Sequence, residues 1–145
     1  MTLRNLVGRS LDEVAPSRDQ VQRLLASVAR AIGDAKVCEV SSEGRFSGAY
    51  GAIRTLADIG LLAHGYRVLT SAPGHHATAI QTLELTFGID ARIVNRLDYL
   101  RKLRNAAEYS GAEIPDSAVS ECLKQAENLH AAAVEWLKLN RRDLV

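Results

Sequence analysis

The sequence has few cysteines and no excess of charge of either sign. Cys38 and Cys122 have no cysteine or histidine at metal-ligand spacing, so we expect buried or idle thiols and neither a disulfide nor a zinc site. Eighteen basic and seventeen acidic residues leave a formal charge of +1. This balance argues against a protein whose whole surface coats nucleic acid or an acidic membrane, and it permits a local basic patch.

Long apolar runs and a secretory leader are also missing. The longest apolar stretch, around 59–63, is far below the roughly 18 residues that span a bilayer. Residues 1–10 lack an apolar core followed by a cleavage site. We therefore expect a cytoplasmic protein with no membrane partner. The 145 residues, 47% of them apolar, suit a single globular domain over 1–145, with 1–16 as a peripheral N-terminal segment.

Apolar residues recur at helical spacing, and period-two alternation is almost absent, so the predicted fold class is all-α. Capping residues such as Ser17 and Asp90, and glycines such as Gly111, mark the ends of the helices. The predicted helices cover about 17–33, 46–64, 75–87, 90–109 and 115–140, with a loop over 66–74. Short connections between long helices favour an up-and-down antiparallel bundle of about five helices.

The predicted helix over 90–109 carries an arginine beside its apolar seam. That seam consists of Ile93, Leu97, Leu100 and Leu103. Arg104 follows Leu100 by one turn, so its guanidinium lies at the edge of the core and needs a partner. Two interpretations are open. Arg104 forms a structural ion pair with Glu108, or it holds an anion such as phosphate, which suits the arginine fork.

Four other residues are candidates for the same site. Asn105 and Tyr109 are one turn apart and share a face near the end of that helix. His75 and His76 begin another helix and offer imidazole for proton transfer, but adjacent side chains point about 100° apart and cannot both reach one point. No third ligand stands at suitable spacing, so we expect no metal.

Motifs of the common enzyme classes are missing. There is no phosphate-binding glycine loop, no dinucleotide fingerprint and no nucleophile elbow, so we expect no cofactor. Arg54 and Asp58 are one turn apart, and the simplest expectation for them is an ion pair within their helix.

Three segments together resemble the HEPN superfamily (higher eukaryotes and prokaryotes nucleotide-binding), especially its small prokaryotic members encoded near nucleotidyltransferase-like proteins. The first is the tyrosine- and alanine-containing helix over 47–58, with 61–67 after it. The second is the histidine-led segment 73–80, and the third is the arginine-containing segment 103–111. Each motif is loose, and the resemblance lies in their order and spacing.

The resemblance implies an antiparallel helical bundle, commonly dimeric, in a family whose active members are metal-independent ribonucleases or toxins. Their motif is an arginine, a polar residue and then a histidine. Arg104 and Asn105 match its first half, and Tyr109 occupies the position of the histidine. A tyrosine, with a pKa of about 10, is a poorer acid or base at pH 7 than a histidine. Ribonuclease activity by the family's route is therefore in doubt.

Three functional hypotheses follow from the residues and the resemblance. The first is an RNA- or nucleotide-binding component of a toxin–antitoxin-like or defence system, with Arg104 on phosphate and Asn105 and Tyr109 shaping the cleft. The second is a metal-independent ribonuclease in which His75 or His76 moves the proton. The third is a structural or partner-docking bundle. The resemblance also implies a homodimer and a nucleotidyltransferase-like protein partner.

Overall fold

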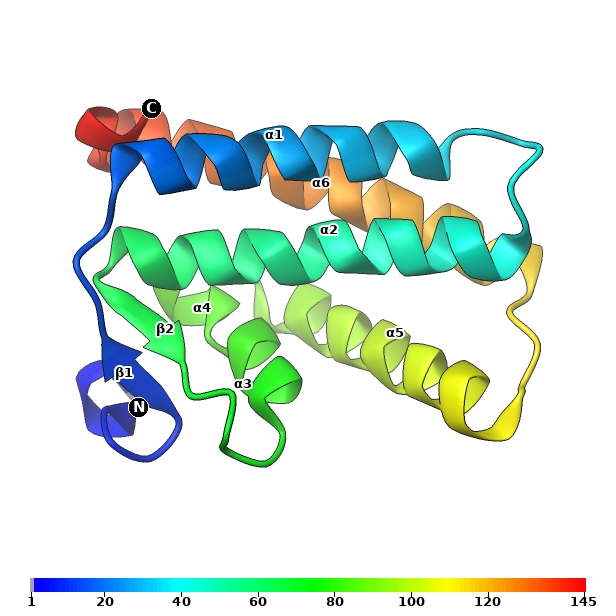
Figure 1. Ribbon diagram of the computed structural model, residues 1–145, viewed down its shortest axis with the longest axis horizontal. Helices are drawn as coiled ribbons and strands as arrows, with labels where there is room; N and C mark the ends of the chain where they lie inside the picture. The colour runs from blue at the N-terminus through cyan, green and yellow to red at the C-terminus, as the bar shows by residue number, and fades with distance from the viewer. Residues whose placement is uncertain (1) are drawn as a thin grey trace.

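The computed structural model describes residues 2–145 as a bundle of α-helices with one small sheet (Figure 1). Its four long helices are α1 (Arg18–Ala35), α2 (Ser42–Ala63), α5 (Ala91–Ser110) and α6 (Asp116–Asn140). They alternate in direction along the bundle. Two short helices, α3 (His75–Gln81) and α4 (Leu83–Thr86), lie between α2 and α5 in the chain and pack beside both. The predicted all-α bundle is confirmed.

Several helix ends lie where local sequence signals predict them. The Ser17 hydroxyl accepts a hydrogen bond from the Gln20 amide at 3.3 Å and caps α1. A carboxylate oxygen of Asp90 accepts one from the Arg92 amide at 2.8 Å and caps α5. Gly111 ends α5 with a φ of 69°, a left-handed conformation that favours glycine. These signals depend only on neighbours in sequence.

Two boundaries differ from the prediction. Helix α2 begins at Ser42 instead of near Phe46, because the Ser41 hydroxyl accepts a hydrogen bond from the Gly44 amide at 3.1 Å and starts the helix earlier. The predicted helix over 75–87 is divided into α3 and α4, since Thr82 between them leaves the helical pattern. Its buried hydroxyl donates to the Ala79 carbonyl at 2.7 Å.

A two-stranded antiparallel sheet replaces part of the predicted loop over 66–74. Strand β1 (Leu11–Glu13) pairs with β2 (Tyr66–Val68), with Leu11 opposite Val68. Strands this short show no readable alternation, so the sequence pattern misses them. The N-terminal segment also contains a short 3₁₀-helix, η1 (Arg4–Leu6), and another, η2 (Arg142–Leu144), follows α6. Met1, which belongs to the predicted segment 1–16, lies outside the described residues.

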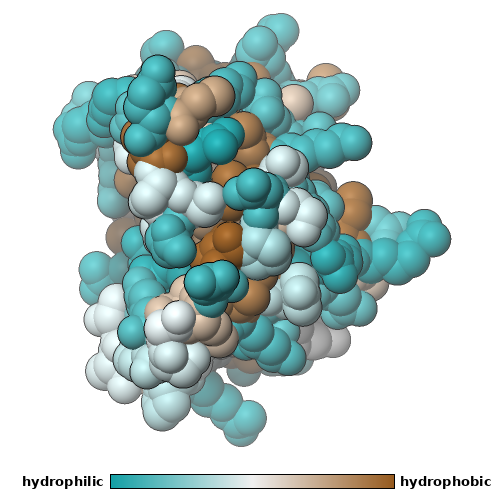
Figure 2. Space-filling model, turned by 90° about the vertical axis from the view of Figure 1, so that its right-hand side faces the viewer, coloured by the Kyte–Doolittle hydropathy of each residue, from teal (hydrophilic) through white to brown (hydrophobic). Residues whose placement is uncertain are grey.

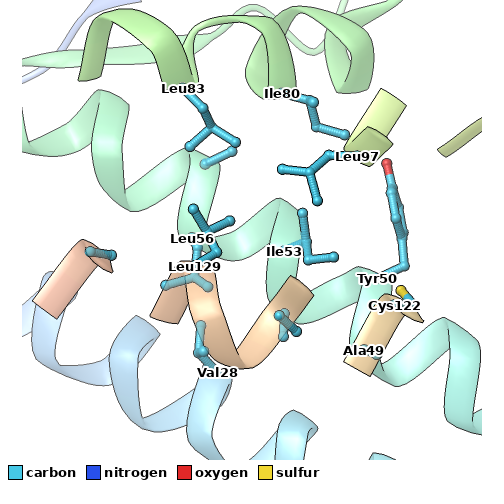
Figure 3. Packing of buried hydrophobic residues seen from close by; sticks show 14 of the residues in the cluster. Val28, Ala49, Tyr50, Ile53, Leu56, Ile80, Leu83, Leu97, Cys122 and Leu129 are labelled. Atoms are coloured by element: carbon cyan, nitrogen blue, oxygen red, sulfur yellow. The ribbon is translucent and has the colours of Figure 1, made fainter. Parts of the chain in front are cut away.

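Helix α2 is the centre of the core and packs against α1, α6, α3 and α5. Its residues are buried on nearly every side along the C-terminal half, as expected for a helix that is apolar all round. Figure 3 shows side chains of α2 and of the helices around it that meet there. Labelled among them are Val28, Ile53, Leu56, Ile80, Leu83, Leu97 and Leu129, all buried.

The predicted seam of α5 is partly wrong. Leu97 and Leu100 are buried, but Ile93 is 41% exposed and Val94 takes its place in the core. Helix α5 packs against its neighbours along a face that is rotated by one residue at its N-terminal end.

The two cysteines have different environments. Cys122 is buried, and burial raises the pKa of its thiol to about 12, which makes it unreactive. Cys38 is a free, exposed thiol in the connection between α1 and α2. Its position outside every helix explains the difference.

One close approach fixes α4 against α2. A Cβ on Gly60 would lie 2.7 Å from the Thr86 hydroxyl oxygen, so only glycine fits without a shift. None of the helices in residues 2–145 combines the length and the apolar character that crossing a membrane requires.

Candidate functional site

Arg104 lies half-buried on α5 between α2 and solvent. Its Nη2 is 2.8 Å from a carboxylate oxygen of Glu108, so the predicted ion pair is present. Its guanidinium carbon also lies 5.2 Å from the centre of the Tyr50 ring, a cation–π contact. The structural interpretation of Arg104 therefore holds in part. Arg104 also lines a hollow.

This hollow, which we call the basic hollow, has a volume of about 260 Å³. Ser47, Tyr50, Gly51 and Arg54 line it from α2, His76 from α3 and Arg104 from α5. A Cβ on Gly51 would meet no other atom within 4 Å, so the backbone of α2 forms an open wall there. Two arginines and a histidine from different helices thus surround one space.

Tyr50 lines the basic hollow, and its buried hydroxyl has no hydrogen-bond partner in residues 2–145. Tyr50 is only 1% exposed. In Figure 3 its oxygen lies on the same side of α2 as Ile80 of α3 and Leu97 of α5. Burial raises the pKa of this phenol, with Arg104 opposing the shift, so the group is a neutral donor. An unsatisfied buried donor costs about 1–3 kcal/mol.

His76 is held neutral by its surroundings. Its Nε2 lies 3.1 Å from Nη1 of Arg54. A guanidinium only donates hydrogen bonds, so Nε2 accepts and the ring proton is on Nδ1. Burial lowers the pKa of His76, and the positive charge of Arg54 lowers it further.

The structure brings some of the predicted site residues together and separates others. Arg104 and His76 share the basic hollow, whereas Asn105 and Tyr109 are not among its lining residues. Tyr109 is 86% exposed near the end of α5, so the face it was predicted to share with Asn105 does not form a wall of this site. The ring that Arg104 contacts is that of Tyr50.

The adjacent histidines face different spaces. The centres of their rings are 4.5 Å apart with an edge-to-face arrangement. His76 lines the basic hollow, and His75 lines a neighbouring one of about 350 Å³, which we call the second hollow. Arg54 borders both. No group of three or more His, Cys, Asp or Glu side chains in residues 2–145 is placed to hold a metal ion.

The predicted ion pair between Arg54 and Asp58 is wrong. Arg54 turns toward His76, and the Asp58 carboxylate has no ion pair or hydrogen bond within residues 2–145. Burial raises the pKa of Asp58, although Arg54 and His75 oppose the shift. Helical spacing alone cannot show that α3 supplies a competing partner for Arg54.

Asp58→Asn should therefore stabilise the protein at neutral pH. A pKa that is higher in the folded than in the unfolded state means that stability falls as the pH rises from about 3.9 through the folded value. At pH 7 the charged carboxylate is a net cost, and we expect the variant to raise Tm by about 2–4 °C, equivalent to about 1 kcal/mol. Thermal denaturation at pH 7 and near pH 3 measures this, and the gain should vanish at the lower pH. Glu39→Gln, which removes an exposed charge, is the control and should leave Tm unchanged.

Sequence reasoning missed Tyr50 and Arg54 as site residues. Ser47, Tyr50 and Arg54 recur at helical spacing and give α2 one face with polar atoms among apolar neighbours. These polar atoms on one face of an otherwise apolar helix could have indicated a site there.

Arg104 also borders a smaller hollow, of about 100 Å³, at the end of the bundle. Apolar lining comes there from Phe46, Ala107 and Ile114. Figure 2 views this end and shows apolar side chains reaching the surface between hydrophilic ones.

No protein-family model matches the chain, and no curated protein or solved structure is similar to it at a significant level.

Proposed function

We propose that the chain is a HEPN-type bundle whose basic hollow binds the phosphate groups of RNA or of a nucleotide, as a component of a toxin–antitoxin-like or defence system. One observation carries the proposal. Arg54, Arg104 and His76 converge on one hollow, which Tyr50 also lines. Each of these groups is a donor, or becomes one on protonation, and phosphate oxygens are acceptors.

The charges of the site suit a phosphate better than a neutral ligand. The guanidinium fork matches the geometry of phosphate oxygens, and Arg54 and Arg104 approach from two helices. When Arg54 donates to the phosphate, Nε2 of His76 becomes free to take up a proton. The ligand thus gains a third cationic donor in a partly buried site, where charge-assisted hydrogen bonds are strong.

Arg104→Ala tests this proposal. We expect binding of a fluorescently labelled single-stranded RNA, followed by anisotropy, to weaken about tenfold or more, because a hydrogen bond to a charged group contributes about 1.5–3 kcal/mol. Arg30→Ala is the matched control, since it removes an equal charge from an exposed position on α1. Equal affinities of the two folded variants would contradict a phosphate site at Arg104.

A second candidate function is metal-independent ribonuclease activity, favoured by the neutral His76 in the same hollow as two arginines. Once Arg54 turns from Nε2 of His76 to the phosphate, this nitrogen accepts the proton of the RNA 2′-hydroxyl, whose oxygen attacks the adjacent phosphorus. The bond from phosphorus to the 5′-oxygen breaks as the 2′,3′-cyclic phosphate forms, water protonates the leaving 5′-oxygen, and the arginines stabilise the developing charge. His76 would then replace the histidine that Tyr109 displaces from the family motif. Incubation of the protein with RNA in EDTA distinguishes the candidates, because cleavage leaves cyclic phosphate ends and binding alone leaves the RNA intact.

The proposal includes a homodimer in which the ends of two α5 helices meet, and docking of a nucleotidyltransferase-like protein. Tyr109, a large ring at the end of α5, is mostly exposed, and apolar side chains surface at the same end of the bundle (Figure 2). Both features suit a covered surface. Light scattering across a range of concentrations measures the mass in solution.

A further inference from the structure

The second hollow adjoins the basic hollow and has a different lining. Leu24, Leu62 and Val68 give it apolar walls from α1, α2 and β2. Asp58 contributes a carboxylate to it, and Arg54 stands at the border with the basic hollow. Gln20, Arg67 and Thr70 add further polar lining. Ligand pockets commonly hold about 300–1,000 Å³, and the second hollow, at about 350 Å³, is within this range.

We propose that the second hollow receives a guanine base whose hydrogen-bond donors face Asp58, while the phosphate of the same nucleotide unit occupies the basic hollow. This inference rests on the proposed function and names the ligand of that site as a guanylate, either free or within RNA. It assigns a binding role to Asp58, Leu24 and Leu62.

The carboxylate of Asp58 is the first support. It is half-buried and has no ion-pair or hydrogen-bond partner in the part of the chain that the structure describes. Its oxygens are not among the buried unpartnered atoms of residues 2–145, so a ligand can reach them. The carboxylate only accepts hydrogen bonds when ionised, so the ligand must present donors to it.

Guanine fits this requirement better than the other bases. Its N1–H and exocyclic amine are adjacent donors, which match the two oxygens of one carboxylate. Adenine and cytosine place an acceptor beside their amine on the same edge, and uracil has a single donor between two carbonyls. An acceptor opposite an ionised carboxylate is repelled. Asp58 therefore attracts guanine and disfavours the other three bases.

The position of Arg54 connects the two hollows. Its guanidinium donates to His76 on the side of the basic hollow, and its side chain also lines the second hollow together with His75. The rings of His75 and His76 are 4.5 Å apart, one on each side of this border. A base and a phosphate joined through one ribose therefore find their walls in neighbouring spaces. The apolar walls contact the faces of the base, as they do in nucleotide pockets.

Isothermal titration of the full chain with GMP, AMP and pyrophosphate tests the assignment. We expect wild type to bind GMP about tenfold more tightly than AMP, the size of discrimination that one bidentate pair provides. Asp58→Asn should remove this preference, because it weakens the binding of GMP and relieves the repulsion that disfavours AMP. Glu39→Gln, with the same change of charge at an exposed position, should leave all three affinities unchanged. A competition experiment shows whether a guanylate within RNA also binds. A short oligouridylate that contains one guanosine should displace bound GMP more effectively than an oligouridylate without guanosine.

Each result decides between the base pocket and the phosphate site. Equal affinities of wild type for GMP and AMP, or a GMP preference that survives Asp58→Asn, would overturn the base pocket. The phosphate site would stand in that case, provided that pyrophosphate binds and Arg104→Ala weakens it. If Arg104→Ala leaves the affinity for pyrophosphate unchanged, the proposed function itself is overturned. Thermal denaturation of each variant ensures that the protein compared is folded.

Discussion

Replacing both Arg54 and Arg104 with alanine should weaken RNA binding by about 10²–10⁴-fold. Both guanidinium groups face the basic hollow, and no other arginine lines it within residues 2–145. Each charge-assisted hydrogen bond contributes about 1.5–3 kcal/mol, so the pair accounts for about 3–6 kcal/mol of binding free energy. Fluorescence anisotropy with a labelled single-stranded RNA measures the change.

The salt dependence of the same titration separates a specific loss from a general loss of charge. Each phosphate contact on a single strand contributes about 0.7 to the slope of log K against log salt, so the double variant should lose about 1.4 from this slope. The control is Arg18→Ala with Arg30→Ala, two exposed positions on α1 outside the ion pairs. If the control loses as much affinity as the site variant, RNA binds by general charge attraction and the basic hollow is not its site.

Leu56→Ala should lower the free energy of unfolding by about 2–5 kcal/mol, the range for large-to-small changes in a packed core. Leu56 is 0% exposed, and in Figure 3 it lies among Leu83 of α4, Ile53 of α2 and Leu129 of α6. Truncation opens a cavity where three helices meet. Since small domains have about 5–15 kcal/mol in total, the loss is a large part of the stability.

Urea denaturation followed by circular dichroism measures this loss. Leu139→Ala is the control, because Leu139 is 77% exposed on α6 and its truncation should change stability by less than about 0.5 kcal/mol. A similar small change for Leu56→Ala would contradict the central place of α2 in the core.

The parts of the fold that depend on neighbouring residues are predictable from the sequence. Ser17, Asp90 and Gly111 end their helices as predicted because a cap needs only the amides of the next turn or a left-handed backbone. The short strands β1 and β2 are not predictable in this way, since they pair residues far apart in the chain.

The same distinction between neighbouring and distant residues applies to the candidate site. Arg104 beside the core and its pair with Glu108 follow from helical spacing and are confirmed. Arg54 does not follow, because its partner His76 is 22 residues further along the chain and reaches it only when α3 packs on α2. Tyr109 shows the reverse. A motif in sequence suggested a role for it, and the structure leaves its ring outside the basic hollow.

Arg54 belongs to both hollows, and one guanidinium cannot serve both fully at once. A phosphate that attracts Arg54 away from the second hollow leaves the Asp58 carboxylate with less compensating positive charge and therefore a greater need for a donor. Occupancy of one space thus changes the affinity of the other. By thermodynamic linkage the effect is reciprocal, so whatever binds to Asp58 alters the hold on phosphate by the same factor. If both proposed sites bind their ligands, a single side chain couples them.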